Sequence, residues 1–491
     1  MTTIYELSEA GRLNPQHLPK LDETQRQQAL ADIPEEMLRG ERAFLPEVSE
    51  LQVVRHYTGL SQLNYGVDTH FYPLGSCTMK YNPRVCNKVA MLPGFLSRHP
   101  LDDHTRAKGM LATLFELQEM LREITAMEAI TLAPMAGAQG EFAGVAMIRA
   151  YHEGRGDHQR TEILAPDASH GTNPATASMC GYTVREVPTT AEGDVDIEQL
   201  KEMVGPKTAG LMLTNPSTLG VFERQVAEIS RIVHEAGGLL YYDGANLNAI
   251  AGRVRPGEMG FDAIHINVHK TFATPHGGGG PGAGPVGVSK RLLPYLPLPR
   301  VAKEGECYRM LEEQDCPVSI GRMGAFGGNV GVLLRAHAYL RLIGAEGVRR
   351  IGNYATLNAN YLMARLKQEG FVLAFPQRRA THEFIITLKD ESEAYGLSAL
   401  NMAKRLLDYG FYAPTIYFPL LVPECMLIEP TETESREELD RFIQAMCDIR
   451  AEAKADPERL AKAPFTTPVR RLDETLAARK PDLAWKRDRE V

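Results

Sequence analysis

Short apolar runs alternate with amphipathic stretches through the middle of the chain. In residues 106–127, Met110, Leu114, Leu121 and other apolar residues recur at helical spacing with Glu and Arg between them. This stretch predicts an amphipathic helix packed on a core. From about Glu128 onward, apolar runs of strand length are separated by helical patterns, which is typical of β–α units and a mostly parallel sheet. The most informative runs are 162–165, 209–213, 239–242 and 263–268.

Polar or glycine-containing residues follow each of these runs at once. The segments are 167–170 (DASH), 214–216 (TNP), 243–246 (DGAN) and 269–271 (HKT). In an open parallel sheet the ligand crevice lies outside the carboxyl ends of the strands. We therefore expect these segments to converge on one site.

The pattern changes towards both ends of the chain. The first hundred residues are rich in Pro, Gly, Tyr and Asn, which is typical of an irregular lead-in. Near the C-terminal end, strand patterns at 371–375 and 382–388 are followed by helical patterns at 398–409 and 435–450. We expect an N-terminal arm (1–100), a large α/β domain (101–335), a connecting helix (336–370) and a small C-terminal α+β domain with a tail (371–491).

Composition and charge narrow the class of protein. Hydrophobic residues make up 44% of the chain and charged residues 24%, which is ordinary for a globular protein. The net charge of −8 comes from interspersed charges, which argues against a nucleic-acid partner. We expect no membrane segment, because the chain has no apolar run of about 18 residues and no signal-peptide pattern. Seven scattered cysteines without a CxxC pair favour reduced thiols in a cytoplasmic protein.

Lys270 is the first candidate for chemistry. It stands just past an apolar run and just before the glycine-rich loop HGGGGPGAGP, His276–Pro285. A lysine desolvated beneath a ligand can attack a carbonyl group and form a Schiff base. Taken alone, Lys270 can equally be an ordinary surface lysine.

Asp243 gives Lys270 a chemical context. A carboxylate at the end of the neighbouring run can keep a pyridine nitrogen protonated, so that the ring accepts electrons. A Schiff-base lysine with an aspartate on an adjacent strand end is the pair that pyridoxal-phosphate chemistry requires. By itself, Asp243 can equally cap a helix that starts near Ala245.

Two further polar residues follow predicted strands. His170 can stack on a cofactor ring or move a proton, or it can simply cap a strand end by hydrogen bonds. Asn215 can donate to the phenolic oxygen of a cofactor, or it can belong to an ordinary Asn-Pro turn.

The segment AGAQGE, Ala136–Glu141, precedes a helical pattern that begins near Phe142. Small residues let backbone amides approach a phosphate group, and the N-terminus of a helix adds a favourable dipole. Many such turns bind nothing. His265, His269 and His276 are spaced by four and seven residues, but His265 falls within a predicted strand, so we expect no metal site.

Five motifs taken together resemble the glycine decarboxylase P-protein family, over nearly the whole chain. They are YPLGSCTMKYNP (72–83), MAGAQGEFAG (135–144), SHGTNPA (169–175), YYDGANLNAI (241–250) and NVHKTFATPHGGGGPGAGPVGV (267–288). The first is rarely met elsewhere, so the combination is specific although each glycine-rich piece alone is not. The resemblance is to the C-terminal half of the long single-chain form, which exists elsewhere as a separate second subunit.

The resemblance implies a fold-type I pyridoxal-phosphate enzyme. By it, Lys270 forms the internal Schiff base and is catalytic, Asp243 pairs with the pyridine nitrogen, and His170 stacks on the ring and is also catalytic. Ala138 and Gln139 are implied to lie at the phosphate. The expected cofactor-binding set is completed by Asn215, Ala245 and His269.

The implied activity is glycine decarboxylation with transfer of the aminomethyl group to the lipoyl arm of H-protein, in the glycine cleavage system of glycine catabolism. The implied partners are a homologous first subunit without cofactor, in a heterotetramer with two copies of each subunit, and lipoylated H-protein.

Three alternatives stay open from the sequence. One is another fold-type I enzyme, such as a cysteine desulfurase or an amino-acid decarboxylase without a protein-borne acceptor. A second is a catalytically silent scaffold for the partner subunit, although Lys270, Asp243 and His170 would then have no chemical purpose. A third is a nucleotide-binding protein suggested only by HGGGGPGAGP, which lacks the GKS or GKT of a P-loop.

Overall fold

The computed structural model of the chain describes residues 2–12, 21–40, 44–276 and 282–485. They divide into two compact units, Met1–Gly66 with Thr466–Val491, and Val67–Phe465. The first unit holds the helices α1 (Glu23–Leu30), η2 (Glu35–Met37), α2 (Glu50–Gln62) and α16 (Glu474–Arg479). None of these four helices contains a buried residue.

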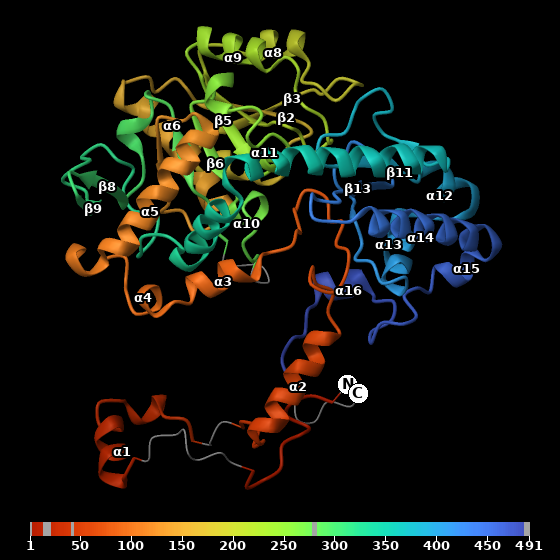
Figure 1. Cartoon of the computed structure of the whole chain (residues 1–491), viewed down its shortest axis with the longest axis horizontal. Helices are drawn as coiled ribbons and strands as arrows, with labels where there is room; N and C mark the ends of the chain where they lie inside the picture. Colours follow the sequence, from red (N-terminus) through yellow and green to blue (C-terminus); the bar gives the residue numbers. More distant parts are fainter. Residues whose placement is uncertain (1, 13–20, 41–43, 277–281, 486–491) are drawn as a thin grey trace. The chain divides into compact units, whose positions relative to one another are not determined.

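A seven-stranded sheet of order β1-β7-β6-β5-β4-β2-β3 forms the centre of the larger part of the second unit (Figure 1). β2 pairs with β3 and β4, β4 with β5, and β5 with β6, all in parallel, whereas β7 runs antiparallel to β1 and β6. The mostly parallel sheet predicted from the sequence is therefore confirmed. Its strands are β1 (Ala129–Thr131), β2 (Glu162–Pro166), β3 (Thr183–Val187), β4 (Thr208–Thr214), β5 (Leu239–Gly244), β6 (Ala263–Ile266) and β7 (Val286–Val288).

Helices cover both faces of this sheet. Alternate residues of a strand point to opposite faces, and on β5 Tyr241 belongs to one apolar cluster and Tyr242 to another. The Tyr241 cluster includes Ile148 of α6, and the Tyr242 cluster includes Leu114 of α5 and Ile229 of α9. The helices here are α3 (Arg84–Ala90), α4 (Pro93–Leu96), α5 (His104–Thr125), α6 (Gly137–Gly154), α7 (Thr172–Met179), α8 (Ile197–Met203), α9 (Val226–Glu235), η3 (Leu247–Ala249), η4 (Pro256–Met259), α10 (Val268–Thr271) and η5 (Leu293–Tyr295), with a hairpin of β8 (Arg300–Glu304) and β9 (Cys307–Leu311).

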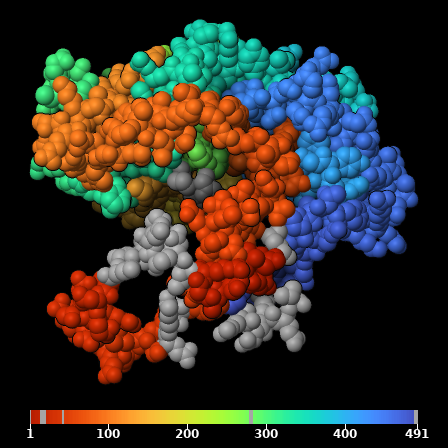
Figure 2. Space-filling model, turned by 60° about the horizontal axis from the view of Figure 1, so that its bottom comes forward, coloured from red at the N-terminus to blue at the C-terminus, as the bar shows by residue number. Residues whose placement is uncertain are grey.

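The long element α11 (Val330–Gln368) runs from the large sheet to a second, smaller sheet (Figure 1). Its backbone departs from helical geometry at Gly344. The small sheet is antiparallel, of order β10-β11-β13-β12. Figure 2 shows the blue surface of this C-terminal part beside the orange and green surface of the large-sheet part. The elements are β10 (Val372–Leu373), β11 (Phe384–Thr387), β12 (Thr415–Ile416), β13 (Cys425–Ile428), α12 (Lys389–Tyr395), α13 (Ala399–Asp408), α14 (Arg436–Ala455) and α15 (Pro457–Leu460).

An extended segment, residues 71–80, joins the two sheets of the second unit. Leu74 forms a β-bridge with Ile428 of the small sheet. The Lys80 amine donates to the Thr271 carbonyl, 2.6 Å away, at the end of α10 in the large-sheet part. Within the described ranges, no helix has both the length and the apolar character needed to cross a membrane. The predicted division of the chain at residues 100, 335 and 370 stays a prediction.

Candidate active site

The carboxyl edge of the large sheet carries the polar residues that the sequence analysis singled out. Asp243 lies near the end of β5, Asn215 follows β4, and Lys270 lies on α10, just past β6. The strand register sets Asp243 between Thr214 of β4 and His265 of β6. The strands thus bring the Asp243 and Lys270 segments to the same edge, as parallel strand order predicts.

Lys270 is half-buried and its amine points to the extended segment 71–80. Its Nζ atom donates to the backbone carbonyl of Ser76, at 2.8 Å. Ser76 has a φ of 63°, in the left-handed region that an L residue seldom adopts. The same segment also contacts His276, whose Nε2 lies 3.2 Å from the Thr78 carbonyl and whose Nδ1 lies 3.7 Å from Cys77 Sγ. The YPLGSCTMKYNP motif therefore supplies one wall around the lysine.

Asp243 is buried and its carboxylate is held on both sides. Oδ1 accepts from the Ala245 amide at 3.0 Å. With the Asn173 side chain oriented so that its nitrogen faces the acids, that nitrogen donates to Asp243 Oδ2 at 3.1 Å. His265 Nε2 lies 3.5 Å from Oδ1, and the other ring nitrogen of His265 bonds to the Tyr241 hydroxyl. These contacts fix the orientation of the carboxylate.

A second acid, Glu141 on α6, lies close behind Asp243. The same Asn173 nitrogen donates to Glu141 Oε1 at 2.7 Å. Burial, and then repulsion by Asp243, raise the pKa of Glu141 to about 8, although hydrogen bonds from Thr172 and Thr176 lower it in part. Sequence reasoning missed this residue, although an acid among the small residues of MAGAQGEFAG was a visible signal.

Glu141→Gln should remove a pH-dependent loss of stability. The pKa of Glu141 is raised above its ordinary 4.5, so its contribution to stability is fully present below about pH 4.5 and is lost as the pH rises towards 8. Glutamine mimics the protonated acid and cannot ionise. We expect the free energy of unfolding of the variant, relative to the wild type, to rise by about 1–2 kcal/mol between about pH 5 and pH 9. Urea unfolding across that range measures it, and a difference independent of pH would contradict the assignment.

The N-terminus of α6 lies against Gly284, near the C-terminal end of the glycine-rich loop. The Gly284 amide donates to the Pro134 carbonyl at 3.0 Å, and a Cβ atom on Gly140 would lie 2.6 Å from the Gly284 carbonyl. Ala138 is exposed at this terminus. Gln139 is turned inward, since its amide accepts from Met135 N at 2.8 Å and donates to Met323 O at 2.7 Å. Gly277–Pro281, part of the predicted HGGGGPGAGP loop, lies outside the described residues.

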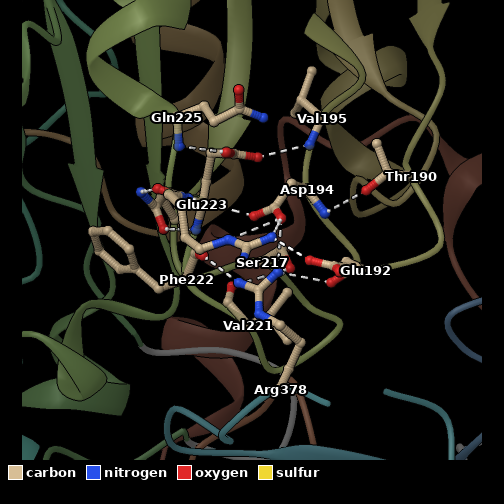
Figure 3. A network of polar contacts seen from close by, with 12 residues as sticks. Thr190, Glu192, Asp194, Val195, Ser217, Val221, Phe222, Glu223, Gln225 and Arg378 are labelled. Carbon is tan, nitrogen blue, oxygen red and sulfur yellow. Dashed lines mark hydrogen bonds and ion pairs between the residues drawn. The ribbon is translucent and has the colours of Figure 1, made fainter. Parts of the chain in front are cut away.

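His170 and Asn215 differ in their surroundings. The His170 ring is exposed, with Nδ1 2.9 Å from the Thr172 hydroxyl. The Asn215 side chain is fully buried and bonds to the backbone of Glu223, accepting from its amide at 2.9 Å. Glu223 is itself held by the amides of Val195 and Gln225 (Figure 3). Asn215 therefore secures the turn after β4, and its predicted contact with a cofactor stays a prediction.

His269 of α10 and His276 lie together beside Lys270. The rings of His269 and His276 are edge to face, with centroids 4.9 Å apart. Burial lowers the pKa of His269 to about 3, with His276 and Lys270 adding to the shift, so its imidazole is neutral. His269 Nδ1 is buried without a hydrogen-bond partner among the residues that the structure describes.

These residues fit pyridoxal phosphate on three counts. Lys270 offers a half-buried amine bonded to a backbone carbonyl, and Asp243 offers an oriented carboxylate at the neighbouring strand end. The 18-residue helix α6 starts at the same edge without a side-chain cap among the described residues, and the first amides of such a helix can bind an anion. The unpartnered Nδ1 of His269 adds a buried polar atom that a ligand can satisfy. Each assigned contact with the cofactor stays a prediction.

Comparison with known proteins identifies the family. The chain is 63% identical over 484 residues to the probable glycine dehydrogenase (decarboxylating) subunit 2 of Thioalkalivibrio sulfidiphilus, covering 98% of this chain and 97% of the relative. It is 64% identical to the protein of that name from Thiobacillus denitrificans, covering 98% and 99% of the two chains. The chain belongs to the glycine dehydrogenase (decarboxylating) subunit 2 family.

Family models and solved structures agree with this membership. Residues 351–464 match the glycine dehydrogenase C-terminal domain, and residues 143–400 match class-V aminotransferases, which are pyridoxal-phosphate enzymes. The crystal structure of an inhibitor-bound glycine decarboxylase (P-protein) aligns with a TM-score of 0.73 at 20% identity, covering 88% of this chain and 99% of that one. Glutamate decarboxylase from Lactobacillus brevis aligns at 0.66 and 14% identity, covering 88% and 98%. The glycine dehydrogenase subunit 2 family thus has the fold-type I architecture that the sequence predicted.

Proposed function

We propose that this chain decarboxylates glycine and passes the remaining aminomethyl group to the lipoyl arm of H-protein, in the glycine cleavage system. The observation that carries the proposal is the pair of Lys270 and Asp243 on adjacent strand ends, in a chain 63% identical to glycine dehydrogenase (decarboxylating) subunit 2 over nearly its full length. A cysteine desulfurase shares the fold at 14% identity, which supports the architecture but not that activity.

Each site residue has a task in the proposal. Bound pyridoxal phosphate supplies an electron sink for the carbon that loses carbon dioxide. Lys270 holds the cofactor covalently, and Asp243 keeps a proton on its ring nitrogen. His170 covers the ring, and the backbone at Ala138 and Gln139 binds the phosphate. The backbone amide of Ala245 donates a hydrogen bond to Asp243 Oδ1 and so fixes the carboxylate on which the electron sink depends.

A partner subunit is part of the proposal, because the relatives are named as second subunits. We propose the homologous first subunit, in two copies with two of this chain. The first unit of the structure supports an interface, since Leu51, Val54 and Tyr57 of α2 are each 55% exposed. Exposed apolar side chains on one helix are typical of a protein-binding surface. All seven cysteines are free thiols, which supports a cytoplasmic location.

Exchange of labelled bicarbonate into the carboxyl group of glycine tests the proposed activity. We expect exchange only when this chain, the first subunit and lipoylated H-protein are all present. Omitting any one should reduce exchange to background, at least about a hundredfold lower. Unlipoylated H-protein is the matched control, because it differs only in the acceptor arm. Equal turnover of bulkier amino acids without H-protein would contradict the proposal and favour a different fold-type I enzyme.

A further inference from the structure

Three buried polar side chains lie behind the segment that contacts the Lys270 amine. We call His382, Glu383 and Glu429 the acid cluster, and their exposed fractions are 0%, 0% and 1%. Glu383 immediately precedes β11 and Glu429 immediately follows β13. These strands are antiparallel and pair as far as Phe384 and Ile428, so the next register position sets the two acids opposite each other.

Each member of the cluster turns one unsatisfied atom towards the others. His382 Nε2, Glu383 Oε1 and Glu429 Oε2 have no hydrogen-bond partner within the described part of the chain. His382 Nε2 is 3.7 Å from Glu383 Oε1 and 4.0 Å from Glu429 Oε2. Buried polar atoms without partners are costly, so a proton or a cation must satisfy this arrangement.

The remaining oxygens of the two acids hold the segment that receives the lysine. Glu383 Oε2 accepts from the Ser76 amide at 2.6 Å, and the Ser76 carbonyl accepts from Lys270 Nζ at 2.8 Å. Glu429 Oε1 accepts from the Thr78 hydroxyl and from the Asn248 amide. A continuous chain of hydrogen bonds therefore runs from Glu383 through Ser76 to Lys270.

The charges of the three side chains indicate whether a proton or a cation satisfies the acid cluster. Two adjacent buried carboxylates cannot both ionise. Burial, and then the charge of Glu429, raises the pKa of Glu383 well above its usual range. Burial also raises the pKa of Glu429, which reaches about 7 after the hydrogen bond from Thr78 and the charge of Lys270 have lowered it in part. Burial lowers the pKa of His382 to about 3, so its ring is neutral. Two acids sharing one proton carry one negative charge, which faces the amine of Lys270.

The other titratable groups around the cluster do not change its single negative charge. Glu432 is ion-paired with Lys80 at 2.5 Å. Burial raises the pKa of the Cys77 thiol, which is therefore neutral. A divalent cation between the two carboxylates would leave the cluster with no net charge, whereas one shared proton leaves it with one negative charge beside the Lys270 amine.

We propose that Glu383 is a positioning residue for Lys270. Its carboxylate holds the Ser76 amide and so orients the carbonyl group that receives the Lys270 amine. The inference rests on the proposed role of Lys270 as the lysine that takes the cofactor.

The test follows the rate at which the purified chain, freed of cofactor, takes up pyridoxal phosphate across a pH series, by absorbance and borohydride trapping. In Glu383→Gln the neutral amide still accepts from Ser76, so the rate should stay within about twofold of wild type. In Glu383→Ala the acceptor is lost, and the rate should fall about tenfold.

Glu391→Gln is the matched control, because Glu391 is another buried acid of the small-sheet part and should leave uptake unchanged. Urea midpoints show which variants fold. If Glu383→Ala does not fold, a rate for Glu383→Gln more than about twofold below the wild-type rate overturns the inference. Glu383→Gln as slow as Glu383→Ala would overturn the inference. So would stoichiometric Zn²⁺ or Mn²⁺ in the wild type that Glu383→Gln loses. A wild-type adduct on any lysine other than Lys270 would instead overturn the proposed function.

Discussion

Lys270→Ala should abolish covalent attachment of pyridoxal phosphate and lower glycine-dependent exchange by at least about a thousandfold. Alanine suits the short helix α10, so the change removes the amine that contacts Ser76 and little else. Borohydride reduction followed by peptide mass measurement reports the attachment. The mass of the reduced adduct should be found on the peptide that contains Lys270 in the wild type and on no peptide in the variant.

Lys80 is the other lysine on which the adduct must be tested. It is a second buried lysine of the same region, with its amine on the Thr271 carbonyl and on Glu432. If the adduct survived in Lys270→Ala and mapped to Lys80, the assignment of the Schiff-base lysine would be wrong. Lys290→Ala, at an exposed position, is the control for the loss of a lysine as such and should leave both attachment and exchange intact.

Asp243→Asn should keep the covalent adduct yet lower exchange by at least about a hundredfold. The asparagine oxygen can still accept from the Ala245 amide, so the local backbone has no reason to move. An amide cannot stabilise a proton on the ring nitrogen, and the electron sink is weakened. The exchange rate is measured per mole of trapped adduct, which separates chemistry from cofactor loss.

Asp262→Asn is the matched control for that variant. Asp262 is also a buried carboxylate of the large-sheet part, bonded to His234 at 2.7 Å and to the Leu240 amide at 3.1 Å. Its replacement should lower the urea midpoint while leaving exchange per adduct within about threefold of wild type. Near-normal exchange in Asp243→Asn would exclude the electron-sink role of Asp243.

The long helix with a strong apolar period and the four apolar runs of strand length were predictable from the sequence, and the three-residue strands β1 and β7 were not. The helix predicted at 106–127 is α5, His104–Thr125, because its apolar stripe covers the core. β1 and β7 are three residues each, too short to show a period, and β7 is buried on both faces. The antiparallel course of β7 depends on tertiary pairing, which a local pattern does not contain.

In the candidate site, too, only some features could be predicted from the sequence. The positions of Lys270, Asp243 and His170 past strand ends could be predicted because each follows an apolar run, and their roles stay predictions. Their supporting contacts could not, since they join segments far apart in the chain. Ser76 and Glu383 are separated by 307 residues, and Asn173 is shared by two acids from different elements. Such pairings become visible only once the strand order is known.

The segment at residues 71–80 has a consequence for biosynthesis. Its hydrogen bonds to Lys270 and to Glu429 close loops of 194 and 351 residues. Contacts that distant form late, because loop-closure entropy must be overcome before they stabilise anything. On the ribosome, the contacts of this segment with Lys270 and Glu429 therefore stay incomplete until residue 429 has emerged, so a shorter translation product would lack the support that the segment gives the lysine.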